Sequence, residues 1–172
     1  MIQKKICMLG TLAVGKTSLV RRFVQSLFGE NYQTTIGVKV DKKMVTLEGR
    51  EVQLMLWDLA GEDRFYGLQT TCVRGSAGLS FVADGTRPDT LAQFMNLSEK
   101  VLRATGDVPC VLAPNKIDLA NEWRLTEADV VACNTRGWDC PARQRQDRPG
   151  CRRAVPASGT PICLAVRAGR SA

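Results

Sequence analysis

The chain has 172 residues, the size of one ordinary domain, and its 44% hydrophobic and 24% charged residues are typical of a soluble globular protein. Its net charge of +7 would suggest a nucleic-acid partner, but eight arginines against two aspartates in the last 40 residues account for +6 of that charge. We therefore assign the basic character to the tail and expect no nucleic-acid partner.

The cysteines and the two ends of the sequence exclude several further classes. Seven cysteines are scattered without a C-x-x-C pair and histidine is absent, which argues for free thiols and against zinc. The first ten residues, MIQKKICMLG, lack the apolar stretch of a signal peptide, so we expect a cytoplasmic protein. No glycine follows Met1 and no cysteine stands in the final GRSA, so no lipid anchor is expected.

The first half of the chain predicts a strand, a helix and a hairpin. Residues 2–9 are a short apolar run, typical of a buried parallel strand, and residues 18–28 carry apolar side chains at helical spacing. Residues 38–46 follow a period of two that places Val38, Val40, Lys42, Met44 and Thr46 on one side of a strand, and after a turn at 47–50 residues 52–57 alternate again. This pattern predicts a β-hairpin that adds one antiparallel edge strand to the sheet.

The second half predicts a βαβ arrangement. Short apolar strands at 79–83 and 108–113 flank residues 91–101, where apolar side chains recur every three or four positions. Thr126 and Asp129 have the spacing of a capping pair, so we expect another helix to begin there. The sequence thus predicts an α/β fold with a mostly parallel sheet and helices on both of its faces.

Residues 10–17, GTLAVGKT, match the phosphate-loop pattern G-x-x-x-x-G-K-[ST] between a predicted strand and a predicted helix. Glycines let backbone N–H groups point at phosphate oxygens, Lys16 can reach the β and γ phosphates, and the Thr17 hydroxyl can bind Mg²⁺. A glycine-rich turn without a ligand is the alternative. The residues expected to bind nucleotide here are Gly10, Ala13, Val14, Gly15, Lys16, Thr17 and Ser18.

The sequence Asn115-Lys116-Ile117-Asp118 follows a predicted strand and suggests which base is bound. The Asp118 carboxylate can accept hydrogen bonds from both the ring N–H and the exocyclic amine of guanine, whereas adenine offers the opposite pattern. Alone this tetrapeptide could be a polar loop. Downstream of a phosphate loop it predicts a guanine nucleotide, with Asn115, Lys116 and Asp118 at the base.

Two further segments point to a metal ion beside the phosphates. Asp58 stands at a predicted strand end in WDLAGE, where it can hold Mg²⁺ through water, and the Gly61 N–H can approach the γ phosphate. An acidic turn after an edge strand is the alternative. Upstream, Thr34 and Thr35 precede the hairpin, and a threonine hydroxyl there could complete the magnesium shell.

These four segments, in this order, resemble the Ras superfamily of small GTPases, and TTIGV with WDLAGEDRF is most similar to its Rab branch. The resemblance covers about residues 1–131. It implies a P-loop NTPase fold and a GTP/GDP switch that uses Mg²⁺ and is recognised by effector and regulatory proteins. By position, Thr35 would join Thr17 and Asp58 as a metal ligand, and Phe28 would lie against guanine, unless Phe28 is a core residue.

Two positions depart from the family pattern and concern hydrolysis. Glu62 stands where Ras and Rab relatives usually have a glutamine that orients water, and Leu12 stands where many relatives have glycine. A carboxylate cannot donate a hydrogen to the γ phosphate and is repelled by it. With Lys16, Gly61 and Glu62 as catalytic residues, we predict a GTPase forming GDP and phosphate no faster than about 10⁻⁴ per second. The alternative is a nucleotide-binding interaction protein with negligible turnover.

The larger departure lies beyond the predicted GTP-binding domain of residues 1–131. The family pattern requires one more strand, an S-A-K loop at guanine and a final helix, whereas residues 132–172 are an Arg/Pro/Cys-rich tail that we expect to be irregular. The last strand and helix should therefore be missing or replaced. Allowed codons for Arg143 to Pro156, read one nucleotide forward, give GSAKTGPGVEELFR, so we hypothesise a reading frame lost between about Val131 and Arg143.

Overall fold

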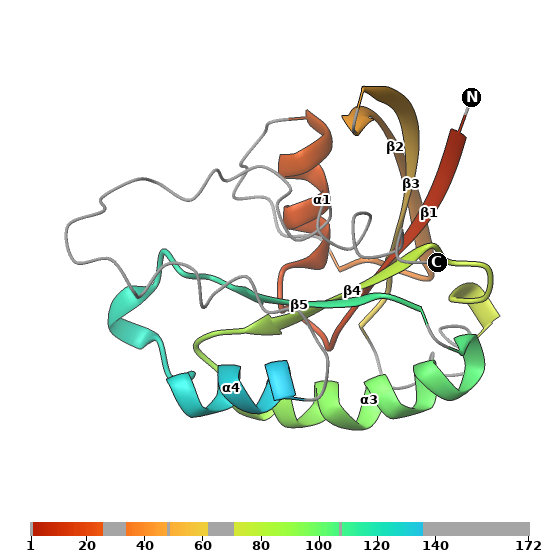
Figure 1. The fold of residues 1–172 in the computed structure, drawn as a ribbon. Coiled ribbons are helices and arrows are strands. Elements are labelled where there is room, and N and C mark those ends of the chain that lie inside the picture. Colours follow the sequence, from red (N-terminus) through yellow and green to blue (C-terminus); the bar gives the residue numbers. More distant parts are fainter. Residues whose placement is uncertain (1, 26–33, 48, 62–70, 107, 136–172) are drawn as a thin grey trace.

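The computed structural model describes residues 2–25, 34–47, 49–61, 71–106 and 108–135 (Figure 1). The predictions for Phe28, Glu62 and residues 136–172 therefore lie outside the described residues. The elements are β1 (Ile2–Leu9), α1 (Lys16–Gln25), β2 (Val38–Leu47), β3 (Arg50–Leu59), β4 (Gly78–Asp84), α3 (Asp89–Thr105), β5 (Cys110–Asn115), the 3₁₀ turn η2 (Ala120–Glu122) and α4 (Glu127–Thr135).

The described strands form one sheet in the order β2-β3-β1-β4-β5. β1 runs parallel to both β3 and β4, β4 runs parallel to β5, and β2 alone is antiparallel to its neighbour β3. The hairpin pairs Leu47 with Arg50, and Gly49 closes its turn at φ 76°, a left-handed conformation that glycine adopts without strain. The predicted mostly parallel sheet with one antiparallel edge strand is confirmed.

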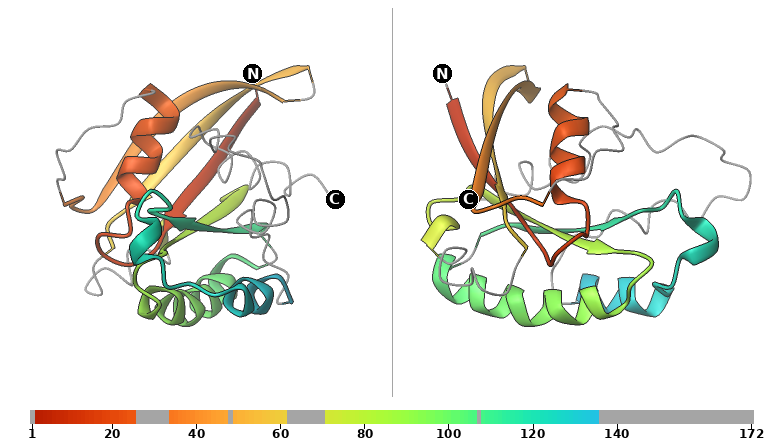
Figure 2. Two further views of the ribbon diagram at one scale, coloured as in Figure 1. Left: turned by 90° about the vertical axis from the view of Figure 1, so that its left-hand side faces the viewer. Right: turned by 180° about the vertical axis from the view of Figure 1, so that it is seen from behind.

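Helices cover both faces of the sheet, as Figures 1 and 2 show, with α1 on one side and α3 and α4 on the other. Alternation along β1 explains this layering, because successive strand residues point to opposite faces. Ile6 and Met8 pack with α1, while Cys7 and Leu9 pack with α3. All four side chains are fully buried, so β1 is covered from both directions at its carboxyl end.

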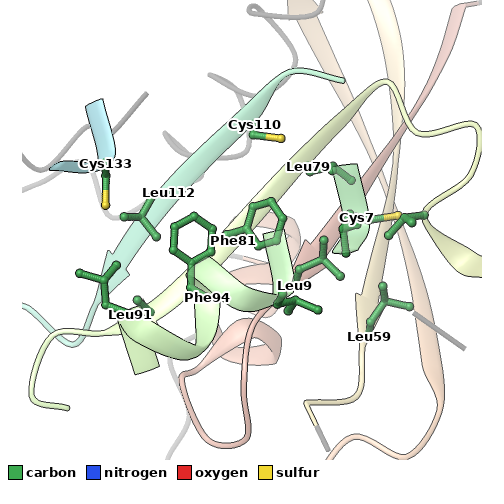
Figure 3. Packing of buried hydrophobic residues seen from close by; sticks show 14 of the residues in the cluster. Cys7, Leu9, Leu59, Leu79, Phe81, Leu91, Phe94, Cys110, Leu112 and Cys133 are labelled. Carbon is green, nitrogen blue, oxygen red and sulfur yellow. The ribbon is translucent and has the colours of Figure 1, made fainter. Parts of the chain in front are cut away.

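The larger apolar cluster lies between the sheet and α3 (Figure 3). Phe81 of β4 and Phe94 of α3 meet at its centre, with ring centroids 4.8 Å apart and planes at 60°. This edge-to-face geometry is the favourable arrangement for two buried aromatic rings. Cys133 brings α4 into the same cluster.

The predicted capping pair begins α4. The Thr126 N–H donates to Asp129 Oδ2 at 2.8 Å, and the Asp129 N–H donates back to Thr126 Oγ1 at 3.3 Å. The helix continues to Thr135, so the domain boundary placed between residues 131 and 132 falls inside it. Among the described residues, no helix is long and apolar enough to span a membrane.

Candidate functional site

The carboxyl ends of the parallel strands meet at one edge of the sheet and bring the predicted segments together. The loop of residues 10–15 follows β1, Asp58 lies near the end of β3, and Asp84 and Asn115 end the neighbouring strands β4 and β5. Parallel sheets characteristically bind ligands at this edge.

Glycine is required at two positions of the loop after β1. A Cβ on Gly10 would lie 2.4 Å from the Val82 carbonyl oxygen, and one on Gly15 would lie 2.3 Å from Asn115 Nδ2. Their φ angles of 145° and 93° also favour glycine. The loop then enters α1, whose first turn is closed by the Leu19 N–H donating to the Gly15 carbonyl at 3.0 Å. The positive end of the helix dipole therefore adjoins the loop, which suits an anion.

Lys16 is buried inside this loop. Its ammonium donates to the carbonyl oxygens of Gly10 at 2.9 Å and Thr11 at 2.8 Å. Burial lowers the pKa of Lys16 to about 8, although the negative charge of Asp58 opposes that shift. A desolvated ammonium beside a helix N-terminus would be stabilised by an anion such as phosphate, so the residues present fit a phosphate-bearing ligand.

Three oxygen-bearing side chains from separate segments meet next to Lys16. Thr17 Oγ1 donates to Asp58 Oδ2 at 2.5 Å, and the Thr17 and Thr35 hydroxyl oxygens are 2.6 Å apart. Asp58 is fully buried, and its Oδ1 has no hydrogen-bond partner among the described residues. Burial raises the pKa of Asp58 above its ordinary value, although the hydrogen bond from Thr17 and the charge of Lys16 oppose that shift. Oxygen ligands and an unsatisfied buried carboxylate fit Mg²⁺.

Gly61 lies directly against the phosphate loop. A Cβ at this position would approach the Thr11 carbonyl carbon and oxygen at 2.5 Å and the Leu12 nitrogen at 2.7 Å, so no larger residue fits without a shift. The preceding residue, Ala60, donates its N–H to the Gly37 carbonyl at 2.9 Å. The segment after β3 is thereby tied to the segment before β2, which carries Thr35.

In the Asn115 to Asp118 segment, Asn115 and Lys116 contact neighbouring segments of the protein, whereas Asp118 is exposed. Asn115 Nδ2 donates to the Val14 carbonyl at 2.9 Å and so holds the phosphate loop. Lys116 has a left-handed backbone at φ 65°, and its ammonium lies 2.7 Å from Asp84 Oδ2. Asp118 is exposed in the following turn, where its carboxylate is open to a base.

Comparison with known proteins identifies the family. The model of the Ras family matches residues 5–141, most of the chain. The chain belongs to the Ras family. It is 35% identical over 131 residues to Ras-related protein Rab-4 of Dictyostelium discoideum, an alignment covering 74% of this chain and 64% of that protein. It is 33% identical to Ras-related protein Rab-21 of Geodia cydonium, covering 76% and 57% of the two chains.

A third relative aligns with a larger share of the chain. Ras-related protein Rab-7b of Mus musculus is 33% identical over 141 residues, covering 80% of this chain and 68% of that protein. The chain nevertheless spans less than two thirds of the Rab-4 and Rab-21 relatives. It is a Rab-like Ras-family chain, and the family match over residues 5–141 contains the four segments.

In this Ras-family chain, the described structure gathers most of the predicted site residues at one edge. Those brought together are Gly10, Ala13, Val14, Gly15, Lys16, Thr17, Thr35, Asp58, Gly61, Asn115 and Lys116, with Ser18 in the first turn of α1 and Asp118 in the turn after β5. Phe28 and Glu62 lie outside the described residues, and the binding and catalytic roles of all these residues stay predictions.

The structure adds Asp84 and Arg87, which the sequence analysis missed. Asp84 is fully buried and accepts hydrogen bonds from the Thr86 N–H, the Thr86 hydroxyl and Arg87 Nε. Burial alone would raise its pKa, but Lys116, Thr86 and Arg87 outweigh burial and lower it to about 2. The position of Asp84 at the end of a buried strand, like that of Asp58, was the available signal.

Proposed function

We propose that this Ras-family chain binds GTP and GDP together with Mg²⁺ and acts as a molecular switch that hydrolyses GTP slowly. The observation that carries the proposal is the convergence, at the N-terminus of α1, of a buried ammonium on Lys16 with oxygens of Thr17, Thr35 and Asp58. A cation-binding group of oxygens beside an anion-binding loop is what a magnesium–triphosphate ligand requires.

Each part of the ligand would have its own residues. Backbone N–H groups of residues 13–18 and the Lys16 ammonium would hold the phosphates, while Thr17, Thr35 and Asp58 would hold the metal. Asp118 would accept the two N–H groups of guanine. Bound Mg²⁺ would neutralise charge on the β and γ phosphates.

The switch would reside in the two segments that carry Thr35 and Gly61. Both adjoin the expected γ-phosphate position, and the Ala60 N–H to Gly37 carbonyl bond links them. Loss of the γ phosphate would remove contacts from both segments together, changing the surface that they present. Effector and regulatory proteins would bind that surface.

Slow hydrolysis follows from Leu12 and Glu62. The Leu12 side chain is 48% exposed, and its backbone nitrogen adjoins Gly61, so its bulk stands near the expected γ phosphate and attacking water. Glu62 supplies a carboxylate where a donor to the phosphate is needed. The same Leu12 geometry favours the second candidate, a nucleotide-binding interaction protein with negligible GTPase activity.

Base choice provides the decisive binding experiment. Affinities of the full chain for GDP, ADP and XDP would be measured by titration calorimetry with and without Mg²⁺. We expect GDP to be preferred, and we expect Asp118→Asn to shift that preference toward XDP, because an amide can donate to the xanthine oxygen that replaces the guanine amine. Glu122→Gln, an exposed carboxylate in η2, is the matched control. Equal affinity for ADP and GDP would contradict the proposal.

Hydrolysis is measured separately, by single-turnover conversion of bound GTP to GDP. A rate near 10⁻⁴ per second or below agrees with a slow switch, and no detectable GDP after several days favours the second candidate. Fast hydrolysis that falls on Glu62→Gln would contradict both.

A further inference from the structure

We infer that Asp84 and Arg87 form a brace that fixes the base-binding loop against the phosphate loop and thereby sets the rate of nucleotide release. This inference rests on the proposed function. It assigns positioning roles to two residues outside the four segments that resemble the Ras superfamily.

The buried centre of the brace is the Asp84 carboxylate. Oδ1 accepts the Thr86 N–H at 3.0 Å and the Thr86 hydroxyl at 2.7 Å, which fixes the carboxylate plane. Oδ2 lies 2.9 Å from Arg87 Nε and 2.7 Å from the Lys116 ammonium. One fully buried oxygen therefore joins the loop after β4 to the loop after β5.

Arg87 extends the brace to the phosphate loop. While its Nε bonds Asp84, its Nη2 donates to the Leu12 carbonyl at 3.0 Å. A planar guanidinium can make two such bonds at once from one rigid group, whereas the single ammonium of lysine is a point donor. The path Lys116, Asp84, Arg87, Leu12 thus connects base loop to phosphate loop through charge-assisted contacts.

This path acts beside a second tie between the same two loops. Asn115 Nδ2 donates to the Val14 carbonyl at 2.9 Å, so the phosphate loop is hydrogen-bonded by neighbouring segments at both Leu12 and Val14. Between these two points lies Ala13 at φ 60°, a left-handed conformation that non-glycine residues adopt only where their surroundings enforce it. The hydrogen bonds at Leu12 and Val14 hold Ala13 in this conformation, in the part of the loop that would surround the phosphates.

Both cationic members of the brace are partly open to solvent, which makes the brace breakable. The Arg87 side chain is 42% exposed and the Lys116 side chain 32%, whereas Asp84 is completely covered. Release of a nucleotide requires the groups around its base and its phosphates to separate, and the brace opposes that separation. Loss of the Arg87 link should therefore speed release while the apolar core remains intact.

The test measures dissociation of the fluorescent analogue mant-GDP from the full chain in the presence of Mg²⁺. Arg87→Ala loses the bonds to Asp84 and Leu12, and it should release mant-GDP about tenfold faster, the factor expected for the one charge-assisted bond that reaches the phosphate loop. Arg87→Lys keeps the charge beside Asp84 but loses the hydrogen bond to the Leu12 carbonyl, so its dissociation rate should lie between those of Arg87→Ala and the parent. Arg103→Ala, an exposed arginine on α3, is the matched control and should release at the parent rate.

A readout of folding separates positioning from general destabilisation. The association rate of Arg87→Ala should match that of Arg103→Ala. Its melting temperature should fall, because Arg87 also stabilises the buried Asp84 carboxylate, and Arg87→Lys, which keeps a charge beside Asp84, separates that loss from the loss of the Leu12 contact. Dissociation at the parent rate in Arg87→Ala, or in Arg87→Lys, would overturn the brace alone, because either result would show that the Leu12 contact does not slow release. If Arg87→Ala does not fold, the mant-GDP dissociation rate of Arg87→Lys is the test, and a rate above that of the parent supports the brace. A parent chain that bound no mant-GDP would overturn the proposed function and the brace together.

Discussion

Replacing Asp84 by asparagine removes the buried charge on which the Lys116 and Arg87 contacts converge. The pKa of Asp84 is lowered from its ordinary 3.8 to about 2, because contacts from Lys116, Thr86 and Arg87 outweigh the effect of burial. This lowering of the pKa from 3.8 to about 2 corresponds to about 2 kcal/mol in favour of the ionised carboxylate in the folded state. Since the folded pKa is depressed, that stability is complete above about pH 4 and is lost as the pH falls toward 2.

Urea unfolding followed by circular dichroism would measure this contribution at several pH values. At pH 7 we expect Asp84→Asn to unfold with about 2 kcal/mol less free energy than the parent at an unchanged m value, and we expect the gap to shrink below pH 4. Glu99→Gln, an exposed carboxylate on α3, should differ little from the parent at any pH. A gap at pH 7 below about 0.5 kcal/mol, or one that persists unchanged at pH 2, would refute the reasoning.

Three other substitutions test the loop and the core. Gly15→Ala should abolish GDP binding measured by calorimetry, because its Cβ would lie 2.3 Å from Asn115 Nδ2 and its φ is 93°; retained affinity would contradict the loop geometry. Phe94→Ala should lower the free energy of unfolding by about 3–5 kcal/mol in urea titrations, since the ring is 1% exposed and packs on Phe81; a loss under about 1 kcal/mol would contradict its central place. Lys16→Met should lose nucleotide binding without lowering the melting temperature of the nucleotide-free protein, because burying the ammonium already disfavours its charged form; a clear drop would show that its two carbonyl bonds outweigh desolvation.

The order and type of the described elements were predictable because both depend on local periodicity. Alternation identified the hairpin, and apolar residues at 91, 94, 97 and 101 identified α3, whose buried face they occupy. The ends were less predictable. The helix expected from residue 18 begins at Lys16, since the Gly15 carbonyl already accepts the Leu19 N–H. The strand expected from residue 108 begins at Cys110, after Pro109, which has no N–H for a ladder.

The site could be predicted where one short segment of sequence contains all the binding groups. It could not be predicted where a side chain contacts a backbone group that is distant in the sequence. Glycine, lysine and threonine at fixed spacing predict a phosphate loop because each residue has a separate role in binding one ligand. The Arg87 contact with Leu12 joins residues 75 positions apart and ends on a carbonyl oxygen, which every residue possesses. Only the meeting of β1 and β4 in the sheet brings that carbonyl within reach of an arginine.

Loss of the S-A-K loop of the family pattern would affect the base half of the candidate site and not the phosphate and metal half. Among the described residues, the contacts around the expected phosphates and metal come from the loop after β1, from Thr35, Asp58 and Gly61, and from residues 84–87 and 115–116, whereas the S-A-K loop of the family pattern would have touched guanine. The family match ends at residue 141, within the interval from Val131 to Arg143 where we hypothesise that the frame is lost. The gene's nucleotide sequence tests that hypothesis directly, because codons that forbid GSAKTGPGVEELFR would end it.

If the frame is lost, base discrimination should suffer more than metal dependence. A chain with the frame restored should prefer GDP over IDP, which lacks the guanine amine, by a larger factor and should bind GDP more tightly. The loss of GDP affinity on removing Mg²⁺ should remain the same in both chains, because Thr17, Thr35 and Asp58 are common to them. Titration of both chains with GDP and IDP, with and without Mg²⁺, separates the two effects. Equal base preference in both chains would mean that the described residues alone determine base recognition, with Asp118 sufficient for it.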